Sequence, residues 1–219
     1  DNTGKYTSLL WEPNEYINIM VYPFTDSQIL GISTFPYSLK NFFLEGTQQV
    51  SASWITLENL SFPYCISINS SYIYEQSTDE RINQNDAAIT LAHELGHYLG
   101  LRHVFSEGGT TSMCTDTDYC KDTPSYNRSE YEQWLNNLDK QNKYQLKDLA
   151  KRYSCEKGEY EAHNIMDYAY CFYNEITLEQ RKRIRHILNY SPLIPGPKES
   201  RIDTRGVQGR LNLPICIMK

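Results

Sequence analysis

An α+β fold is predicted for this chain by the order in which its hydrophobic patterns occur. Segments with the period of strands occupy the first third of the sequence, and segments with the period of helices follow, separated by polar loops. Parallel α/β folds alternate the two patterns instead. The length of 219 residues is enough for one sizeable core, or for two lobes that share a cleft. We therefore expect a single domain, residues 1–219.

Three segments near the start of the chain have the pattern of strands. The first, YINIMVY at residues 16–22, alternates and is rich in β-branched and aromatic side chains. ILGISTFP at residues 29–36 and CISINSSYIY at residues 65–74 are weaker candidates, and turn-forming residues separate the three.

A helix is predicted after these strands. From an N-cap at Asn85 or Asp86, the stretch AAITLAHELGHYL repeats apolar residues at helical spacing. The repeating residues are Ile89, Ala92, Leu95 and Leu99. We expect this helix to be mostly buried.

The second half of the chain has less regular patterns. Residues 104–128 are rich in Ser, Thr, Asp, Gly and Cys, which predicts a long loop, and residues 129–153 predict a polar surface helix. A last helix begins at Thr177, which can form a capping box with Gln180, and ends near Leu188. The rest of the chain is interrupted by proline and glycine and has no clear period.

Composition argues against some partners. The net charge is −6 without a long run of either sign, which argues against nucleic acid or an anionic membrane as a partner. No apolar stretch approaches the roughly 18 residues of a membrane-spanning helix. Because the chain starts at Asp1 without a methionine or an apolar leader, we interpret it as a processed fragment.

The six cysteines are an even number and include no C-x-x-C pair. We favour disulfides in an exported protein over buried thiols in a cytosolic enzyme, because four of the six lie in loop-like sequence. The chain is then expected outside the cytoplasm, as a secreted, periplasmic or surface-anchored protein. The sequence leaves the pairing open.

The stretch HELGHYLGLRH at residues 93–103 predicts a metal site. His93 and His97 are four residues apart, so on a helix their Cβ atoms lie about 6 Å apart and both imidazoles can reach one zinc ion. Glu94 lies beside this pair, about 100° from His93 and about 60° from His97 around the helix. That placement suits a general base for a water at the metal better than a ligand.

His103 joins the same ion only if the helix breaks. In a continuous helix it would lie about 15 Å along the axis from His93 and about 80° around it. Gly100 allows the break, because glycine adopts positive φ angles that other residues resist. Three neutral imidazoles with an open position for water are typical of catalytic rather than structural zinc. Three unrelated surface histidines are the weaker interpretation, because five such fixed positions recur by chance in about one chain in ten thousand.

The motif H-E-x-x-H-x-x-G-x-x-H resembles that of the metzincin metallopeptidases and, among them, the pappalysin family. NIMDYAYC at residues 164–171 is similar to the methionine turn beneath the zinc of that clan, with Met166 as the turn residue and Tyr168 two positions later. DYCKDTP at residues 118–124 and the later ITLEQRKRI are similar to further pappalysin segments. The resemblance extends from about residue 16 to residue 188.

The resemblance implies a zincin-like catalytic domain. A twisted mixed sheet and the zinc helix would form an upper lobe of residues 1–100. An irregular helical lower lobe of residues 101–190 would hold His103 and the methionine turn, and residues 191–219 would form a tail. A cleft between the lobes would bind an extended peptide.

The resemblance also implies a zinc-dependent endopeptidase that acts on a peptide or protein substrate. Zn²⁺ on the three histidines would activate a water, Glu94 would be the general base, and Tyr168 would help to hold the oxyanion. The substrate would add as a strand to a sheet edge near residues 66–70. The alternatives are a zinc amidase for a non-protein substrate and a catalytically silent zinc-binding module. We expect a monomer.

Disulfides of the family tie its lower lobe together. Three cysteines lie where such bonds would be useful: Cys114, Cys155 and Cys171. Cys120 lies inside the D-T-P segment, where an apolar residue is expected, so its pairing stays open. In one hypothesis Cys216 keeps the zinc centre inactive. A disulfide of Cys216, with Cys65 as the candidate partner, is favoured over that hypothesis.

Some relatives bind calcium in the loop before the D-T-P segment. Asp116, Asp118 and Asp122 supply the hard oxygen ligands that calcium prefers. Solvated surface acids are the alternative interpretation of these three residues.

Overall fold

The computed structural model of the chain describes residues 7–51, 63–74, 86–106, 117–154, 156–196, 198 and, for the backbone, 215–218. Its strands are β1 (Ile19–Tyr22), β2 (Gly31–Thr34), β3 (Tyr37–Leu39), β4 (Gln48–Val50), β5 (Ile66–Asn69), β6 (Lys151–Ser154), β7 (Gly158–Glu161) and β8 (Ile215–Met218). Its α-helices are α2 (Ala87–Tyr98), α3 (Arg128–Asn137), α4 (Leu146–Leu149) and α5 (Leu178–Tyr190). Short 3₁₀ turns lie at Thr7–Leu9 and Ser70–Tyr72.

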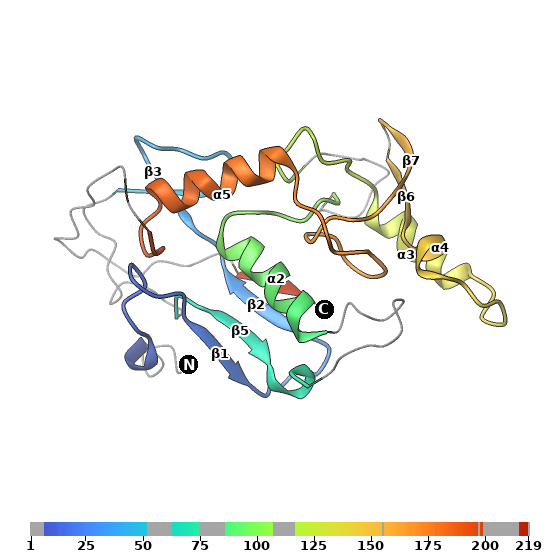
Figure 1. Cartoon of the computed structure of the whole chain (residues 1–219), viewed down its shortest axis with the longest axis horizontal. Coiled ribbons are helices and arrows are strands. Elements are labelled where there is room, and N and C mark those ends of the chain that lie inside the picture. Colours follow the sequence, from blue (N-terminus) through green and yellow to red (C-terminus); the bar gives the residue numbers. More distant parts are fainter. Residues whose placement is uncertain are drawn as a thin grey trace.

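The main sheet has four strands in the order β1-β5-β2-β8. β1 runs parallel to β5, whereas β2 runs antiparallel to both of its neighbours, β5 and β8. Helix α2 lies across this sheet, and α3, α4, β6 and β7 are grouped at one end of the molecule (Figure 1). The predicted α+β fold with a mixed sheet is therefore confirmed.

The three strands predicted from the sequence are all present and are shorter than predicted. The segment 65–74 forms a strand only up to Asn69, because the Asn69 side chain accepts a hydrogen bond from the backbone N–H of Ser71 and begins a 3₁₀ turn there. Helix α2 begins after the predicted N-cap residue Asp86. The capping box of Thr177 and Gln180 is also present, at the start of α5.

The single helix predicted for residues 129–153 is wrong. The helix α3 ends at Asn137, and Leu138 has an extended backbone. A one-turn helix, α4, follows, and the last three residues of the segment form β6 together with Ser154; β6 pairs with β7. Arg152 and Ser154 of β6 are buried while their neighbours are exposed. Contacts with the rest of the fold, and not the helical propensity of these residues, decide the structure at the end of this segment.

The residues predicted as a tail take part in the main sheet and its core. Leu193 and Ile194 are buried in a cluster with Tyr98 of α2 and Ile187 of α5. β8 pairs with β2 along four residues, and this strand was missed because proline and glycine interrupt the segment before it and no clear period is present.

The sheet edge predicted to bind substrate is also wrong. Residues 66–69 form β5, which lies between β1 and β2, so its backbone groups are paired on both sides. A central strand has no free hydrogen-bonding edge to which a peptide can add.

No disulfide is present among the cysteines whose side chains the structure describes. Cys65, Cys120 and Cys171 are buried free thiols, so the bonds expected for Cys65 and Cys171 are not found. The Cys171 thiol instead donates a hydrogen bond to the carbonyl of Asn164 and accepts one from the N–H of Tyr173. Cys114 and Cys155 lie outside the described residues, as does the side chain of Cys216.

Candidate metal centre

The end of helix α2 forms a Schellman motif. The N–H of Leu101 donates to the carbonyl of Gly96 at 2.9 Å, and the N–H of Gly100 donates to the carbonyl of His97 at 2.9 Å. These two bonds satisfy carbonyls that a helix end otherwise leaves unpaired, and they need a residue with positive φ at the position of Gly100. Gly100 has a φ of 87°.

Gly100 is required for a second reason, the close packing of α5. A Cβ atom at this position would lie 2.7 Å from Cγ1 of Ile187. The guanidinium of Arg183, also in α5, donates to the carbonyl of Gly100. Helix α5 therefore packs directly against the turn that redirects the chain toward His103.

The turn brings three imidazoles together. The Nε2 atoms of His93 and His97 lie 3.1 Å apart, those of His97 and His103 lie 3.0 Å apart, and those of His93 and His103 lie 3.2 Å apart. The rings of His93 and His97 are buried completely, and His103 is 7% exposed.

Two of these rings are oriented by backbone carbonyls. Nδ1–H of His93 donates to the carbonyl of Ile165 and Nδ1–H of His97 donates to the carbonyl of Leu101, both at 2.8 Å. This leaves the Nε2 lone pairs directed at one another. Burial lowers the pKa of His97 and of His103 well below the ordinary value, and the neighbouring histidines lower both further. Both rings are therefore neutral near pH 7, as metal ligands must be.

A zinc ion fits this cluster. The three Nε2 atoms lie 3.0–3.2 Å from one another, close enough that all three histidines would hold one zinc ion at the roughly 2.0–2.1 Å of a Zn–N bond. Among the residues that the structure describes, these three histidines are the one group of this kind, and no acid or cysteine joins them. Three protein ligands with a fourth position left over are typical of catalytic zinc.

Glu94 is buried next to this cluster, against the main sheet. A Cβ atom at Gly31 of β2 would lie 2.6 Å from Cγ and 2.9 Å from Oε1 of Glu94. Only a glycine at this position of β2 leaves room for the glutamate. Gly31 was not predicted as part of the site, although a glycine inside a predicted strand is a signal of close backbone approach.

Met166 lies beneath the histidines and is completely buried. A Cβ atom at Gly96 would lie 2.3 Å from its sulfur, so this glycine inside α2 permits the close approach of the methionine turn. The ring centroid of Tyr168 lies 4.5 Å from that of His103 and 5.5 Å from that of His93. The turn thus supports the cluster with one residue and packs a phenol against it with another.

The three candidate calcium ligands do not form a described cluster. Asp118 is buried and accepts hydrogen bonds from the N–H of Cys120 and the hydroxyl of Thr123. The carboxylate of Asp122 accepts from the N–H of Glu179 at the start of α5. Asp116 lies outside the described residues. In this structure Asp118 and Asp122 hold the loop and α5 in place.

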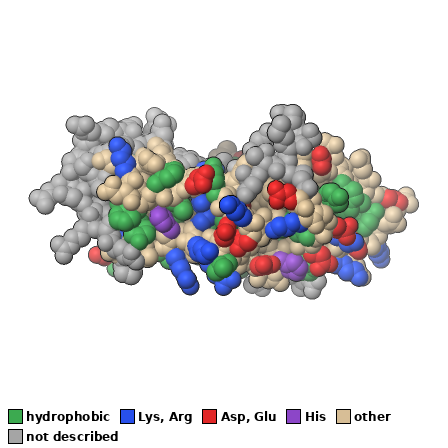
Figure 2. Space-filling model, turned by 90° about the horizontal axis from the view of Figure 1, so that it is seen from above, with side chains coloured by type: hydrophobic (Ala, Val, Ile, Leu, Met, Phe, Trp, Pro, Cys, Tyr) green, Lys and Arg blue, Asp and Glu red, His purple; other side chains and the backbone are tan. Residues whose placement is uncertain are grey.

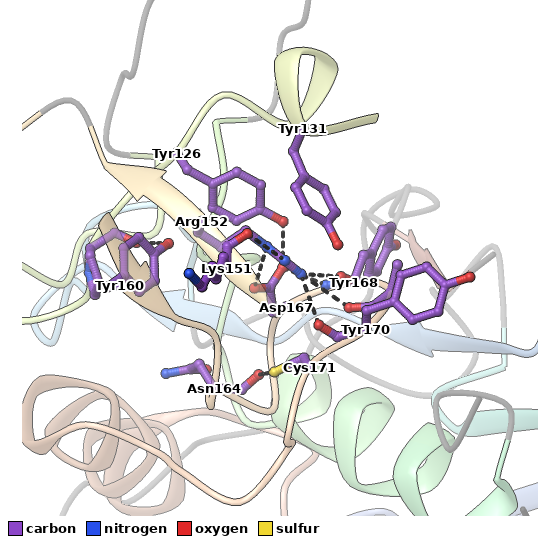
Figure 3. A network of polar contacts seen from close by, with 12 residues as sticks. Tyr126, Tyr131, Lys151, Arg152, Tyr160, Asn164, Asp167, Tyr168, Tyr170 and Cys171 are labelled. Carbon is purple, nitrogen blue, oxygen red and sulfur yellow. Dashed lines mark hydrogen bonds and ion pairs between the residues drawn. The ribbon is translucent and has the colours of Figure 1, made fainter. Parts of the chain in front are cut away.

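Two charged residues were not predicted from the sequence: Arg152, which lies beneath the methionine turn, and Asp167, which lies within it. They form an ion pair, with Arg152 Nε 3.4 Å from Asp167 Oδ2, and both side chains are almost completely buried (Figure 3). The position of Asp167 between Met166 and Tyr168 was a local signal for its importance. No local signal marked Arg152, because its segment was interpreted as a surface helix.

A family model matches the chain over residues 45–189, more than half of its length. That model is peptidase family M43, with the description pregnancy-associated plasma protein-A. The chain belongs to this peptidase family. The match includes α2, the methionine turn and α5, so the M43 chain carries the three elements that build the histidine cluster.

Relatives of this M43 chain include fungal proteins named as extracellular metalloproteases. One from Arthroderma otae is 30% identical over 187 residues, which cover 84% of the chain and 55% of the relative. Another, from Arthroderma benhamiae, is 37% identical over 108 residues, which cover 48% of the chain and 32% of the relative. The chain thus spans about half or less of the length of these relatives.

A solved structure is also similar to the M43 chain. It is mature mirolysin of Tannerella forsythia in complex with a cleaved peptide, 21% identical, with a TM-score of 0.43. The similar region covers 80% of the chain and 53% of mirolysin.

Proposed function

We propose that the chain is the catalytic domain of a zinc-dependent endopeptidase that acts on peptides or proteins. The observation that carries this proposal is the convergence of three buried imidazole nitrogens beside a buried glutamate, with no fourth protein ligand among the described residues. Membership of the M43 peptidase family supports it.

His93, His97 and His103 would hold the ion through Nε2. The chemistry that bound Zn²⁺ supplies is a lowered pKa for water and a polarised scissile carbonyl. Glu94 accepts the proton that the attacking water loses as the new C–O bond forms, and it delivers a proton to the leaving nitrogen as the C–N bond breaks. The phenol of Tyr168, packed on His103, stabilises the negative charge on the carbonyl oxygen.

The Glu94→Gln variant tests this assignment. It keeps the size of the side chain and removes its basicity, so we expect zinc content to match the parent and kcat for peptide hydrolysis to fall by a factor of about 10² or more. Zinc is measured by atomic emission and turnover with a library of mixed peptides, with and without a chelator. A Glu94→Gln variant that cleaves peptides as fast as the parent would falsify the role of Glu94.

The same library separates the peptidase from the zinc amidase. Chelator-sensitive cleavage of internal peptide bonds supports the endopeptidase. A chain that binds zinc and cleaves no peptide contradicts it and leaves the amidase or the silent zinc module.

We further propose that the chain acts outside the cytoplasm as a monomer. The support for this location is that the fungal relatives are named as extracellular. No helix among the described residues is long and apolar enough to cross a membrane. Among the described residues on the face seen in Figure 2, basic and acidic side chains are interspersed.

A further inference from the structure

A buried cation lies directly beneath the methionine turn. Arg152 points inward from β6, with its side chain fully buried, and pairs with Asp167 of the turn. An isolated buried charge is costly, and a buried pair is tolerated only where further hydrogen bonds satisfy its remaining donors and acceptors. The hydrogen bonds of this ion pair therefore indicate which parts of the backbone it holds in place.

The guanidinium of Arg152 binds the backbone of the turn. Its Nη2 donates to three consecutive carbonyls, those of Tyr168 at 3.1 Å, Ala169 at 3.1 Å and Tyr170 at 3.4 Å. Its Nη1 donates to the carbonyl of Leu149 at 2.9 Å. One side chain thus ties the end of α4 to the segment that follows Met166, and Figure 3 shows Arg152 beside Asp167, Tyr168 and Tyr170.

The segment that Arg152 holds has an unfavourable backbone conformation. Ala169 and Tyr170 have φ values of 48° and 21°, although neither is a glycine. Such conformations cost about 1–3 kcal/mol each and persist only where the surroundings fix them. The carboxylate of Asp167 fixes the other side of the turn, since Oδ1 accepts from the hydroxyl of Tyr126 and from the N–H of Tyr168.

The turn is connected to the histidines at three points. The carbonyl of Ile165 accepts from His93, and the carbonyl of Met166 accepts from the N–H of Val104, the residue after His103. The ring of Tyr168 packs on that of His103. A shift of the turn would therefore move the phenol relative to the imidazoles.

We propose that Arg152 is a positioning residue for the proposed peptidase reaction, and that it acts by holding the turn of residues 167–170 so that Tyr168 faces the metal centre. This inference rests on the proposed function. Arg152 touches neither the histidines nor a substrate, and its effect passes through the backbone of the turn and the phenol. The fork of donors is essential, because the single ammonium nitrogen of a lysine keeps the charge but cannot be at once beside the turn carbonyls that Nη2 contacts, the Leu149 carbonyl that Nη1 contacts and the Asp167 carboxylate beside Nε.

The first test measures the turn without any substrate. In the zinc-loaded Arg152→Lys variant we expect amide hydrogen exchange of residues 167–171 to become at least about tenfold faster, while α2 exchanges as in the parent. Lys151→Met is the matched control, since it removes an exposed cation from the same strand and should change neither segment. Tyr126→Phe, which takes away one hydrogen bond to Asp167, should loosen the same residues to a smaller extent.

Two exchange results overturn the proposal. One is unchanged exchange at residues 167–171 in Arg152→Lys. The other is faster exchange throughout the chain, or failure of Arg152→Lys to fold, which makes Arg152 a determinant of the whole fold.

The second test is kinetic. We expect Arg152→Lys to lower kcat about tenfold or more and to leave KM within about threefold, because a small misplacement of a positioned group affects the transition state most. In the Tyr168→Phe background the same substitution should change kcat by less than about twofold, since the group that it positions is gone. Two results overturn the proposal. One is a double variant in which the two substitutions lower kcat by the product of their separate factors, and the other is an Arg152→Lys variant with the kcat of the parent.

The two tests also separate this inference from the proposed function. If the parent chain cleaves no peptide, the proposed function fails, and the exchange measurement still decides whether Arg152 holds the turn. If the parent cleaves peptides and the exchange of the turn is unaffected in Arg152→Lys, only the role of Arg152 fails.

Discussion

At the scale of single residues, two glycines decide how closely the elements around the histidine cluster approach one another. Gly31 admits Glu94 against the sheet, and Gly96 admits the sulfur of Met166 against α2. A glycine inside a helix costs about 1 kcal/mol relative to alanine, so its presence at position 96 indicates a packing requirement. The contact with Met166 is that requirement.

The Gly96→Ala variant separates propensity from packing. Alanine favours the helix, but its Cβ would lie 2.3 Å from the Met166 sulfur, so we expect a net loss of about 1–3 kcal/mol in the free energy of unfolding. Urea unfolding measures it. Ala88→Gly, at an exposed position of the same helix, is the control for propensity alone. A Gly96→Ala variant more stable than the parent would show that Met166 moves away without cost.

At the scale of elements, whether a helix or strand was predicted from the sequence depends on the length of the hydrophobic pattern around it. The helices α2 and α5 have 12 and 13 residues and were predicted with their N-caps, because several turns of apolar spacing identify a helix. The strands β6 and β8 have four residues each and were missed. The predicted strands β1, β2 and β5 also have four residues each, but they lie within patterned segments of seven to ten residues, whereas β6 follows a helical pattern and β8 lies in a segment without a clear period.

Strand β8 leads to a prediction about access to the site. It pairs with the edge of β2, with Met218 opposite Gly31, the residue in contact with Glu94. A free edge of β2 would present backbone groups to an extended peptide beside the metal centre. We therefore expect deletion of residues 215–219 to raise kcat/KM several-fold for long peptides, measured by fluorescence of quenched substrates.

A short chromogenic amide, which cannot pair with a strand, is the control for this deletion and should be cleaved at the parent rate. Equal or lower kcat/KM for the long peptides would show that β8 does not compete with them for the edge of β2.

At the scale of the whole molecule, burial of uncharged tyrosines and thiols shapes the pH dependence of stability. Burial raises the pKa of the Cys65 thiol to about 11 and raises that of Tyr64 well above 10. Between about pH 9 and pH 11 the folded chain therefore holds protons that the unfolded chain has lost, so the free energy of unfolding falls as the pH rises through this range.

This effect is measurable as the urea midpoint at pH 7.5, 9.5 and 10.5, which we expect to fall steadily. The urea midpoint of the Cys65→Ala variant should fall less over the same pH range, because this variant lacks one of the groups whose pKa differs between the folded and unfolded states. A midpoint that is constant up to pH 10.5 would contradict the burial of these groups.

The sequence by itself determined the α+β class, the helix that carries His93, Glu94 and His97, and the need for a turn at Gly100. These features follow from local spacing, since the geometry of a helix fixes which side chains share a face. The tertiary structure alone decided that Gly31 admits Glu94, that β5 is a central strand and that Arg152 lies beneath the methionine turn. Each of these depends on contacts between segments far apart in the chain, which no local period records, and a buried ion pair in particular is recognisable only when both partners and their surroundings are in place.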